Sequence, residues 1–263
     1  MAARLHNLVA WVTGGGTGIG KAVAIELARE GAAVVVSGRR TDRLTGAVAA
    51  IEAVGGRAAG VACDVTDDAS VAAAVAEVIE RFGRLDVVVA NAGFSVGGRL
   101  EKTSVEDWER QFATNLFGVV RTVVHAMPHL QQTRGRVALM GSVAQYLPVP
   151  GAGCYAASKA AVHAYGQTLS AELTGSGVSC TTIHPGFIES EIAQVDNQGQ
   201  FHPDRDDKRP AALMWTPEAA ARPMVRAIAR RKRVAVITGH GKVAAFLGSH
   251  LPGLVSMLMS RAS

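Results

Sequence analysis

Short apolar runs alternate with longer amphipathic segments along most of the chain. Seven runs rich in β-branched residues have the length of buried strands, at 8–12, 33–37, 60–64, 86–90, 136–140, 179–183 and 234–238. The alanine-rich segments between them repeat apolar residues with the period of a helix. Strands that are apolar on both faces and separated by helices indicate a parallel sheet covered on both sides. The pattern therefore predicts a doubly wound α/β fold of about seven strands.

Two segments depart from this alternation, but no linker or repeat divides the chain, and we predict one domain over residues 1–263. Residues 189–215 are rich in Gln, Asp, Asn and Pro and predict a lid or insert over a site. Residues 240–263 predict an amphipathic helical tail that Pro252 splits in two. Its apolar stripe would be buried in the domain or a subunit contact. The alternative is docking on a membrane together with the arginines of 226–233.

Charge and cysteine content narrow the class of protein. With 27 Lys and Arg against 22 Asp and Glu, the chain carries a formal charge of +5, without the interleaved aromatic residues of a nucleic-acid reader. Cys63, Cys154 and Cys180 lack disulfide or metal spacing, so we expect no metal and a reducing compartment. The first strand leaves no room for a signal peptide, and no apolar run reaches about 18 residues. We expect a cytoplasmic protein that binds no nucleic acid and is membrane-peripheral only if the tail docks on lipid.

The first predicted strand runs directly into a glycine-rich turn and then a helix. A turn of this kind brings backbone N–H groups and a helix N-terminus close to a pyrophosphate without interference from Cβ atoms. The alternative is a tight turn without a ligand. The turn residues that we expect to contact a dinucleotide are Gly14, Gly16, Thr17, Gly18, Ile19 and Gly20.

The second predicted strand ends in arginines where a protein that binds NAD usually has an acid. Arg39 and Arg40 occupy this position, and no carboxylate is present. A guanidinium binds the 2′-phosphate of NADP in a fork, whereas an acid repels it. We therefore expect NADP(H) to be preferred over NAD(H), the alternative being that both arginines are solvated loop residues.

Several separated motifs follow in a fixed order: TGGGTGIG at 13–20, Cys63-Asp64-Val65, Asn91-Ala92-Gly93, Asn115, Ser142, YAASK at 155–159 and Pro185-Gly186. In this order, from about Leu8 to Ile192, the sequence resembles the single-domain short-chain dehydrogenases and reductases, which have a Rossmann-type fold. The resemblance implies an oxidoreductase acting on an alcohol or carbonyl, and a homodimer or homotetramer formed through helices within 104–129 and 158–173.

The resemblance also implies roles for individual residues. Asn115, Ser142, Tyr155 and Lys159 match the catalytic tetrad of the family. Further cofactor contacts are implied for Asp64, Val65, Asn91, Ala92, Gly93, Tyr155, Lys159, Pro185, Gly186, Ile188 and Ser190.

The tyrosine and lysine of the YAASK motif also make chemical sense without the family. Residues four apart share one face of a helix, so Tyr155 and Lys159 would project together. A free tyrosine has a pKa of about 10, and a nearby ammonium favours the phenolate. We expect Lys159 to tune Tyr155 as proton donor and acceptor, with Ser142 donating to the carbonyl oxygen. A surface pair on the helix is the ordinary alternative for the two residues alone.

Substrate recognition is expected in loops at the carboxyl ends of the strands. The predicted pocket residues are Ser95, Gln145, Tyr146, Phe187 and Trp215. No charge cluster accompanies them, which favours a bulky, apolar, lipid- or steroid-like ketone or secondary alcohol. The alternative from another class is a catalytically idle NADP-binding scaffold or sensor of the same fold.

Overall fold

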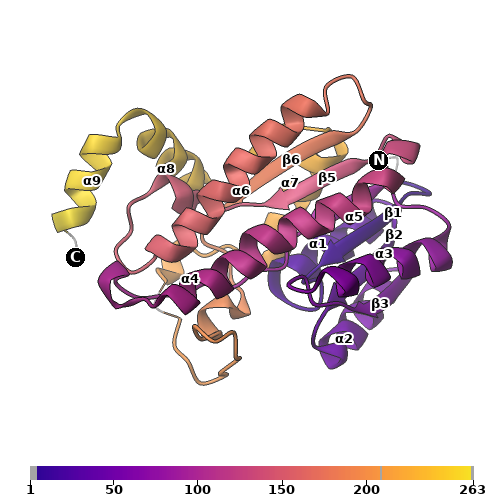
Figure 1. Ribbon diagram of the computed structural model, residues 1–263, viewed down its shortest axis with the longest axis horizontal. Helices are drawn as coiled ribbons and strands as arrows, with labels where there is room; N and C mark the ends of the chain where they lie inside the picture. The colour runs from indigo at the N-terminus through magenta and orange to yellow at the C-terminus, as the bar shows by residue number, and fades with distance from the viewer. Residues whose placement is uncertain (1–4, 208, 262–263) are drawn as a thin grey trace.

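The computed structural model describes residues 5–207 and 209–261 and contains one sheet of seven parallel strands (Figure 1). Their order across the sheet is β3-β2-β1-β4-β5-β6-β7. The strands are β1 Val9–Thr13, β2 Ala33–Gly38, β3 Ala58–Ala62, β4 Val87–Ala90, β5 Arg136–Met140, β6 Ser179–Pro185 and β7 Val234–Ile237. All seven predicted strands are present, and the doubly wound fold is confirmed. β3 begins two residues earlier than predicted.

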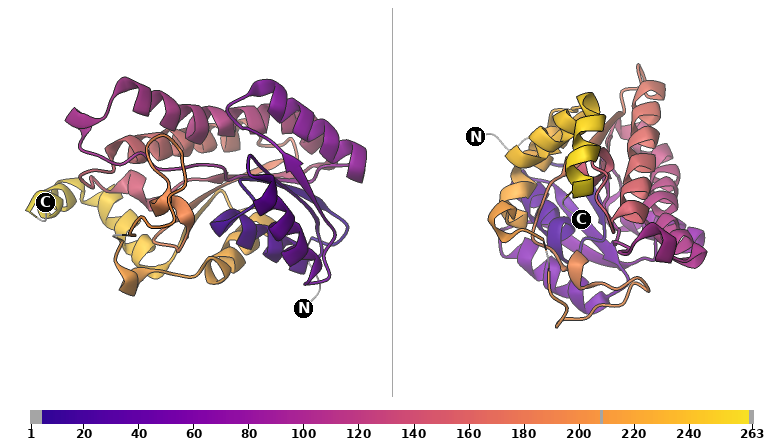
Figure 2. Two further views of the ribbon diagram at one scale, coloured as in Figure 1. Left: turned by 90° about the horizontal axis from the view of Figure 1, so that it is seen from below. Right: turned by 90° about the vertical axis from the view of Figure 1, so that its left-hand side faces the viewer.

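Helices cover both faces of the sheet, as the views in Figure 2 show. The helices are α1 Gly18–Arg29, α2 Thr41–Glu52, α3 Asp68–Phe82, α4 Val105–Phe112, α5 Gly118–Thr133, α6 Gly153–Glu172, α7 Pro217–Ala229, α8 Gly239–His250 and α9 Pro252–Arg261. One apolar core lies between the sheet and α1, α2 and α7, and the other between the sheet and α3, α5 and α6. The strands are apolar on both faces because both faces are buried.

The strand order reverses direction between β1 and β4, because the chain fills one half of the sheet before it starts the other. Trp11 of β1 pairs with Val35 of β2 on one side and with Val88 of β4 on the other. The loops after β1 and β4 therefore leave the sheet in opposite directions, and a crevice opens between them. This is the position at which open α/β sheets bind ligands.

Helix α6 approaches β6 closely at a glycine. A Cβ atom on Gly166 would lie 2.2 Å from Thr182 Oγ1 and 3.0 Å from Leu139 Cδ1. Glycine is therefore required for this helix to rest on the sheet at its observed depth. Because α6 also carries Tyr155 and Lys159, this contact sets the height of both side chains above the strand ends.

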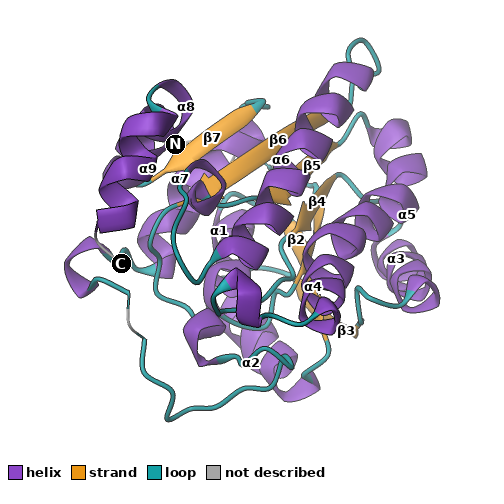
Figure 3. Cartoon of the chain, turned by 60° about the vertical axis from the view of Figure 1, so that its left-hand side comes forward, coloured by secondary structure: helices purple, strands orange, loops and turns teal. Residues whose placement is uncertain are grey.

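The predicted lid is an irregular segment between β6 and α7, drawn as a long loop in Figure 3. Its base is closed by a parallel bridge between Ile188 and Trp215. Its tip is shaped by a bridge between Val195 and Phe201 and by Asp196, whose carboxylate accepts from the amides of Gln198 and Gln200. The lid is therefore a hydrogen-bonded unit.

The predicted tail forms α8 and α9, which break at Leu251, directly before Pro252. Helix α8 packs on the loop after β5, where a Cβ on Gly248 would lie 2.0 Å from the Tyr146 carbonyl oxygen, and α9 packs on α8. Val255 of the stripe is buried, whereas Phe246 and Leu258 are more than half exposed. Burial of the whole stripe in the domain's own core, one of the expected alternatives, is thus wrong.

The arginine cluster does not border this tail. It ends at Arg233, directly before β7, whereas α8 begins directly after that strand. The two features lie at opposite ends of β7, and Arg231 is engaged by the carbonyl oxygens of Arg134, Gly135 and Gly177. The tail and the end of the arginine cluster therefore do not adjoin, and a membrane contact through the tail would not include Arg231. Among the described residues no single helix is long and apolar enough to cross a membrane. Helices α8 and α9 reach that length and apolar content only when taken together, across a bend of 111°.

The substitution Gly166→Ala is expected to lower the free energy of unfolding by about 1–3 kcal/mol, because the new methyl group collides with β6. Gly46→Ala is the matched control: this glycine lies in the exposed part of α2, and a Cβ there meets nothing within 4 Å. The control should be neutral or stabilising by up to about 1 kcal/mol. Urea unfolding of the two variants measures both changes, and equal stability would contradict the proposed close contact.

Candidate active site

A cavity of about 530 Å³ lies at the carboxyl edge of the sheet, over the crevice between β1 and β4. All residues predicted from the sequence to contact the cofactor line it. They come from the glycine turn, from the ends of β2, β3, β4 and β6, from α6 and from the start of the lid. Of the predicted tetrad, Ser142, Tyr155 and Lys159 line the cavity as well.

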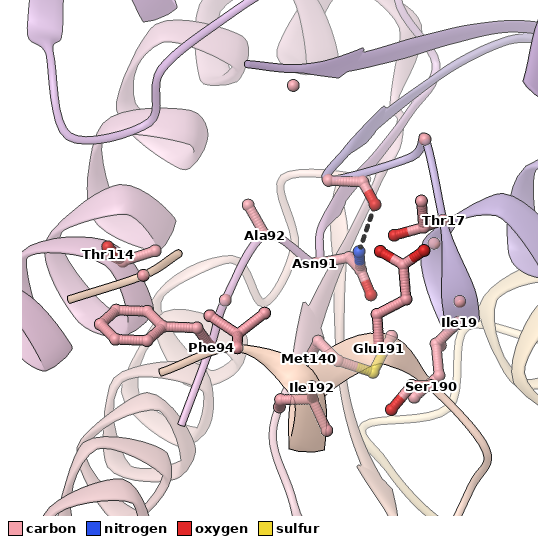
Figure 4. Close-up of a pocket in the computed structure, with 18 of the residues that line it drawn as sticks. Thr17, Ile19, Asn91, Ala92, Phe94, Thr114, Met140, Ser190, Glu191 and Ile192 are labelled. Carbon is pink, nitrogen blue, oxygen red and sulfur yellow. Dashed lines mark hydrogen bonds between the residues drawn. The ribbon is translucent and has the colours of Figure 1, made fainter. Parts of the chain in front are cut away.

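The glycine turn forms one wall of this cavity and is fixed by Asn91. The Asn91 side-chain amide donates to the carbonyl oxygens of Thr13 and Gly14, which ties the end of β4 to the turn. Figure 4 shows one hydrogen bond of Asn91 as a dashed line. Gly14 and Gly18 have positive φ, and a Cβ on Gly20 would lie 2.2 Å from the Gly14 carbonyl oxygen. Only glycine fits these positions.

Helix α1 begins at this turn with its first amides free of a side-chain cap. Its N-cap, Thr17, makes no capping hydrogen bond, and no acidic residue lies in the first turn. The residues of the first helical turn, and with them the positive end of the helix, face the cavity. This arrangement fits a pyrophosphate.

Positive charge gathers at the end of the cavity beside β2, where a dinucleotide would place its adenosine half. Arg39, Arg40 and Arg43 follow β2 at this adenosine end. Arg40 is not free, because its guanidinium lies 2.7 Å from a carboxylate oxygen of Glu191 in the lid. Arg39 has no ion-pair partner among the described residues. The expected arginines are thus in place, and the structure adds a carboxylate from 151 residues further along the chain.

The other end of the cavity brings together Ser142, Tyr155 and Lys159. Lys159 is buried, and its ammonium donates to the Met140 carbonyl oxygen at 2.8 Å and lies 5.7 Å from the centre of the Tyr155 ring. The Ser142 hydroxyl accepts from the Ala144 amide at 3.1 Å, which directs it from the end of β5. Three residues from two elements therefore converge on one wall.

Asn115 lies behind this wall in a five-residue π-helical segment, Ala113–Phe117, between α4 and α5. It is fully buried; its amide group donates to the Phe94 carbonyl oxygen and to Ser158, and its oxygen accepts from the Phe94 amide. A Cβ on Gly93 would lie 2.9 Å from the Asn115 oxygen. Asn115 therefore holds the loop after β4 against α6, and does not line the cavity itself.

Burial controls the ionisation of the tyrosine and lysine. It raises the pKa of Tyr155 above its usual value, although the Ser142 hydroxyl and the charge of Arg209 act in the opposite direction. Burial also lowers the pKa of Lys159 to about 8. The expectation that Lys159 lowers the pKa of Tyr155 is therefore not met by these side chains alone, because loss of hydration outweighs a charge that is not in direct contact.

None of the five residues predicted for the substrate pocket lines the cavity. The Gln145 amide lies 2.7 Å from buried His184, against which the ring of Tyr146 packs edge-on. Phe187 stacks on His240. Trp215 pairs with Ile188 at the base of the lid, and Ser95 is half-buried in the loop after β4.

Residues from the lid complete the cavity and were not predicted from the sequence. Glu191, Gln198, Phe201 and Arg209 line it. The Arg209 guanidinium is paired with Asp207 and donates to the carbonyl oxygens of Ile188 and Ser190. No motif marks these residues, because their roles depend on how an irregular segment folds back over the sheet.

The fold and the cavity together define a dinucleotide-binding α/β protein with a tyrosine, a serine and a lysine at one end of its site. Residues 8–200 match the family model described as short chain dehydrogenase, and the chain belongs to this family. Membership of a dehydrogenase family makes the chain an oxidoreductase.

Relatives and solved structures agree with this assignment. The chain is 35% identical over 246 residues to the hydroxynaphthalene reductase arp2 of Aspergillus fumigatus, covering 93% of this chain and 87% of that protein. A short chain dehydrogenase/reductase of Burkholderia phymatum, solved with NAD, superposes with a TM-score of 0.83 at 26% identity, covering 93% of each chain. A short chain dehydrogenase of Burkholderia cenocepacia, solved with NADP, has a TM-score of 0.80 at 30% identity, covering 91% of this chain and 99% of that chain.

The buried lysine predicts a characteristic pH dependence of stability. Between the lowered pKa of about 8 and the ordinary value of 10.5, the unfolded chain holds the Lys159 proton and the folded chain does not, so stability rises with pH. Relative to Lys159→Met, the wild-type free energy of unfolding should rise by about 1.5 kcal/mol from pH 8 to pH 9.5, because the slope approaches about 1.4 kcal/mol per pH unit only between the two pKa values. Urea unfolding of both proteins checks this difference.

Lys102 is exposed, and Lys102→Met is the control for this measurement. That variant should follow the wild type across the pH range. Parallel curves for wild type and Lys159→Met would contradict the lowered pKa.

Proposed function

We propose that the protein is an NADP(H)-dependent oxidoreductase that interconverts a ketone or aldehyde with its alcohol, acting on a bulky apolar substrate. The observation that carries the proposal is the convergence of Ser142, Tyr155 and Lys159 at one end of a cavity whose other end holds a glycine turn and arginines. A non-catalytic scaffold has no use for a lysine buried beside a tyrosine, since burial costs this cation part of its hydration.

The dinucleotide site supports NADP over NAD through its charge. Arg39 and Arg40 directly follow β2, Arg43 lies in the first turn of α2, and the usual acid of an NAD site is missing from that strand end. Asn91, the glycine turn and the first turn of α1 would hold the pyrophosphate. When bound, the nicotinamide ring supplies or accepts the hydride. The solved relatives were crystallised with NAD in one case and NADP in the other, so this preference rests on the arginines.

The catalytic residues then handle the proton and the developing charge. Because burial raises the pKa of Tyr155, its phenol remains protonated at neutral pH and donates to the alkoxide that forms during carbonyl reduction. The Ser142 hydroxyl donates a hydrogen bond to the same oxygen, where charge develops. Lys159 supplies a positive charge within 5.7 Å of the Tyr155 ring centre, which stabilises the phenolate that is left.

Exposed apolar side chains on loops at the carboxyl edge of the sheet support a bulky apolar substrate. Leu100, Val149, Leu213 and Trp215 are all exposed and belong to the loop after β4, the loop after β5 and the lid. These loops leave the sheet at its carboxyl edge, where the reactive residues lie. One relative is named for hydroxynaphthalene, a fused-ring aromatic molecule of this kind.

The proposed assembly is a homodimer or homotetramer formed through α4, α5 and α6. Val105, Phe117 and Val124 on and between α4 and α5 are each more than half exposed. Apolar groups gathered on adjacent helices favour a partner subunit at this face.

The proposed location is the cytoplasm, with peripheral contact to a membrane through α8 and α9. Helix α9 extends beyond the body of the molecule (Figure 1), and Leu251, Leu254, Met257 and Leu258 are exposed on the tail. An amphipathic pair in this position can lie in the lipid interface. It would bring the substrate loops close to lipid-like molecules.

Tyr155→Phe is expected to reduce turnover at least about 100-fold, because it removes the only proton that the phenol can donate. Oxidation of NADPH should be followed with ketones and aldehydes graded from small and polar to steroid-sized. Tyr165→Phe is the matched control, since Tyr165 lies on the same helix but not in the cavity lining. Equal activity of the two variants would contradict the assignment of Tyr155. Absence of Tyr155-dependent turnover in a protein that binds NADPH would favour the scaffold.

The tail proposal predicts that the wild type sediments with vesicles of phosphatidylcholine and phosphatidylserine. Leu254→Glu with Leu258→Glu should abolish sedimentation, because charges on the apolar face oppose insertion into lipid. Ser256→Glu with Ser260→Glu, on exposed polar positions of the same helix, should keep most of it. A wild type that does not sediment, or a leucine variant that changes only the oligomer size, would place the tail at a subunit contact instead.

A further inference from the structure

The lid places a single carboxylate among the arginines of the adenosine end. Glu191 Oε2 lies 2.7 Å from Arg40 Nη2, and Glu191 Oε1 lies 4.0 Å from Arg43 Nη2. Figure 4 shows this carboxylate directed into the cavity beside Thr17, whose hydroxyl also accepts from Arg40 at 3.4 Å. The carboxylate therefore lies where the sequence predicts that a phosphate binds.

The tip of the lid also contacts the arginines of this ion pair. The Phe201 ring lies over the guanidinium groups of Arg40, at 5.5 Å, and Arg43, at 6.0 Å. Phe201 is held by its bridge to Val195, and Asp196 organises the intervening turn. The lid thus contacts the arginines through both a charge and an aromatic face.

A 2′-phosphate and the Glu191 carboxylate would compete for the same guanidinium. Both are anions that Arg binds through the same fork of N–H groups. A phosphate held by Arg40 would also lie close to a displaced Glu191, and like charges at short range repel. Engagement of Arg40 by the phosphate therefore requires Glu191 to leave that guanidinium.

We propose that Glu191 is a specificity-determining residue: it is the counter-ion that the 2′-phosphate of the cofactor must displace from Arg40. This inference rests on the proposed preference for NADP(H). The ion pair lowers the affinity for ligands with a 2′-phosphate and keeps the lid on the arginines until such a ligand arrives. A ligand without this phosphate gains nothing from the exchange.

The test measures binding of two fragments by titration calorimetry of the full chain, without turnover. Adenosine 2′,5′-diphosphate carries the 2′-phosphate, and ADP does not. Glu191→Gln keeps the size and polarity of the side chain but removes its charge, so it should bind the 2′,5′-diphosphate about three- to tenfold more tightly and ADP within about twofold of the wild type. The gain should shrink at high salt, since exposed charges are screened.

Glu189→Gln is the matched control, because Glu189 is exposed in the same segment and lies outside the cavity lining. It should bind both fragments like the wild type. An equal gain in affinity for the 2′,5′-diphosphate in the control would show that the effect comes from the net charge of the protein, and would overturn the proposal. Unchanged binding by Glu191→Gln would overturn it as well. Weaker binding of ADP by that variant would make Glu191 an acceptor for the ribose hydroxyl, and would also overturn it.

Failure of the underlying cofactor preference is distinguished in the wild type itself. If both the wild type and Arg39→Ala bind adenosine 2′,5′-diphosphate no more tightly than ADP, the 2′-phosphate is not recognised. The proposed NADP(H) preference is then wrong. If the wild type prefers the 2′,5′-diphosphate and Glu191→Gln does not change this preference, only the role of Glu191 is wrong.

Discussion

The parallel direction of all seven strands is the constraint on which the site depends. Parallel pairing places every carboxyl end at one edge of the sheet, and the reversal of order at β1 and β4 opens that edge. Residues as distant in sequence as Gly14, Ser142 and Gly186 meet there because each follows the end of a strand. A chain with mixed strand directions would distribute these groups over two edges and would not form the cavity.

Close approach of backbone, more than charge, fixes the depth of this cavity. Gly20 lets α1 press against the turn, and Gly166 lets α6 rest on β6. The α6 contact determines how far Lys159 reaches under the end of β5, where it donates to the Met140 carbonyl oxygen. The same burial lowers the pKa of Lys159 and raises that of Tyr155. Packing and proton chemistry are therefore consequences of one geometry.

Much of the fold and of the cavity wall could be predicted because both depend on local patterns. Strands apolar on both faces, and turns that only glycine fits, leave signals within a few residues, as at 13–20. Gln145 and Tyr146 were placed correctly after β5, but their side chains turn toward His184, and no local signal gives that direction. The π-helical segment that holds Asn115 was also missed, because a single widened turn leaves the apolar period nearly unchanged.

The position of the lid could not be predicted from local sequence patterns, and it changes the charge around the arginines that follow β2. A strand end with two arginines and no acid indicates a site for the 2′-phosphate of NADP, since binding of the NAD ribose usually needs a carboxylate at that position. The structure places Glu191 beside Arg40, although the two residues are 151 positions apart in the sequence. The charge at this site therefore comes from two segments, the end of β2 and the lid. Only the end of β2 has a sequence pattern that indicates its role. To infer the cofactor preference from the residues at one strand end is to assume that no other segment contacts them. In this protein the lid does contact them, through Glu191 and Arg40.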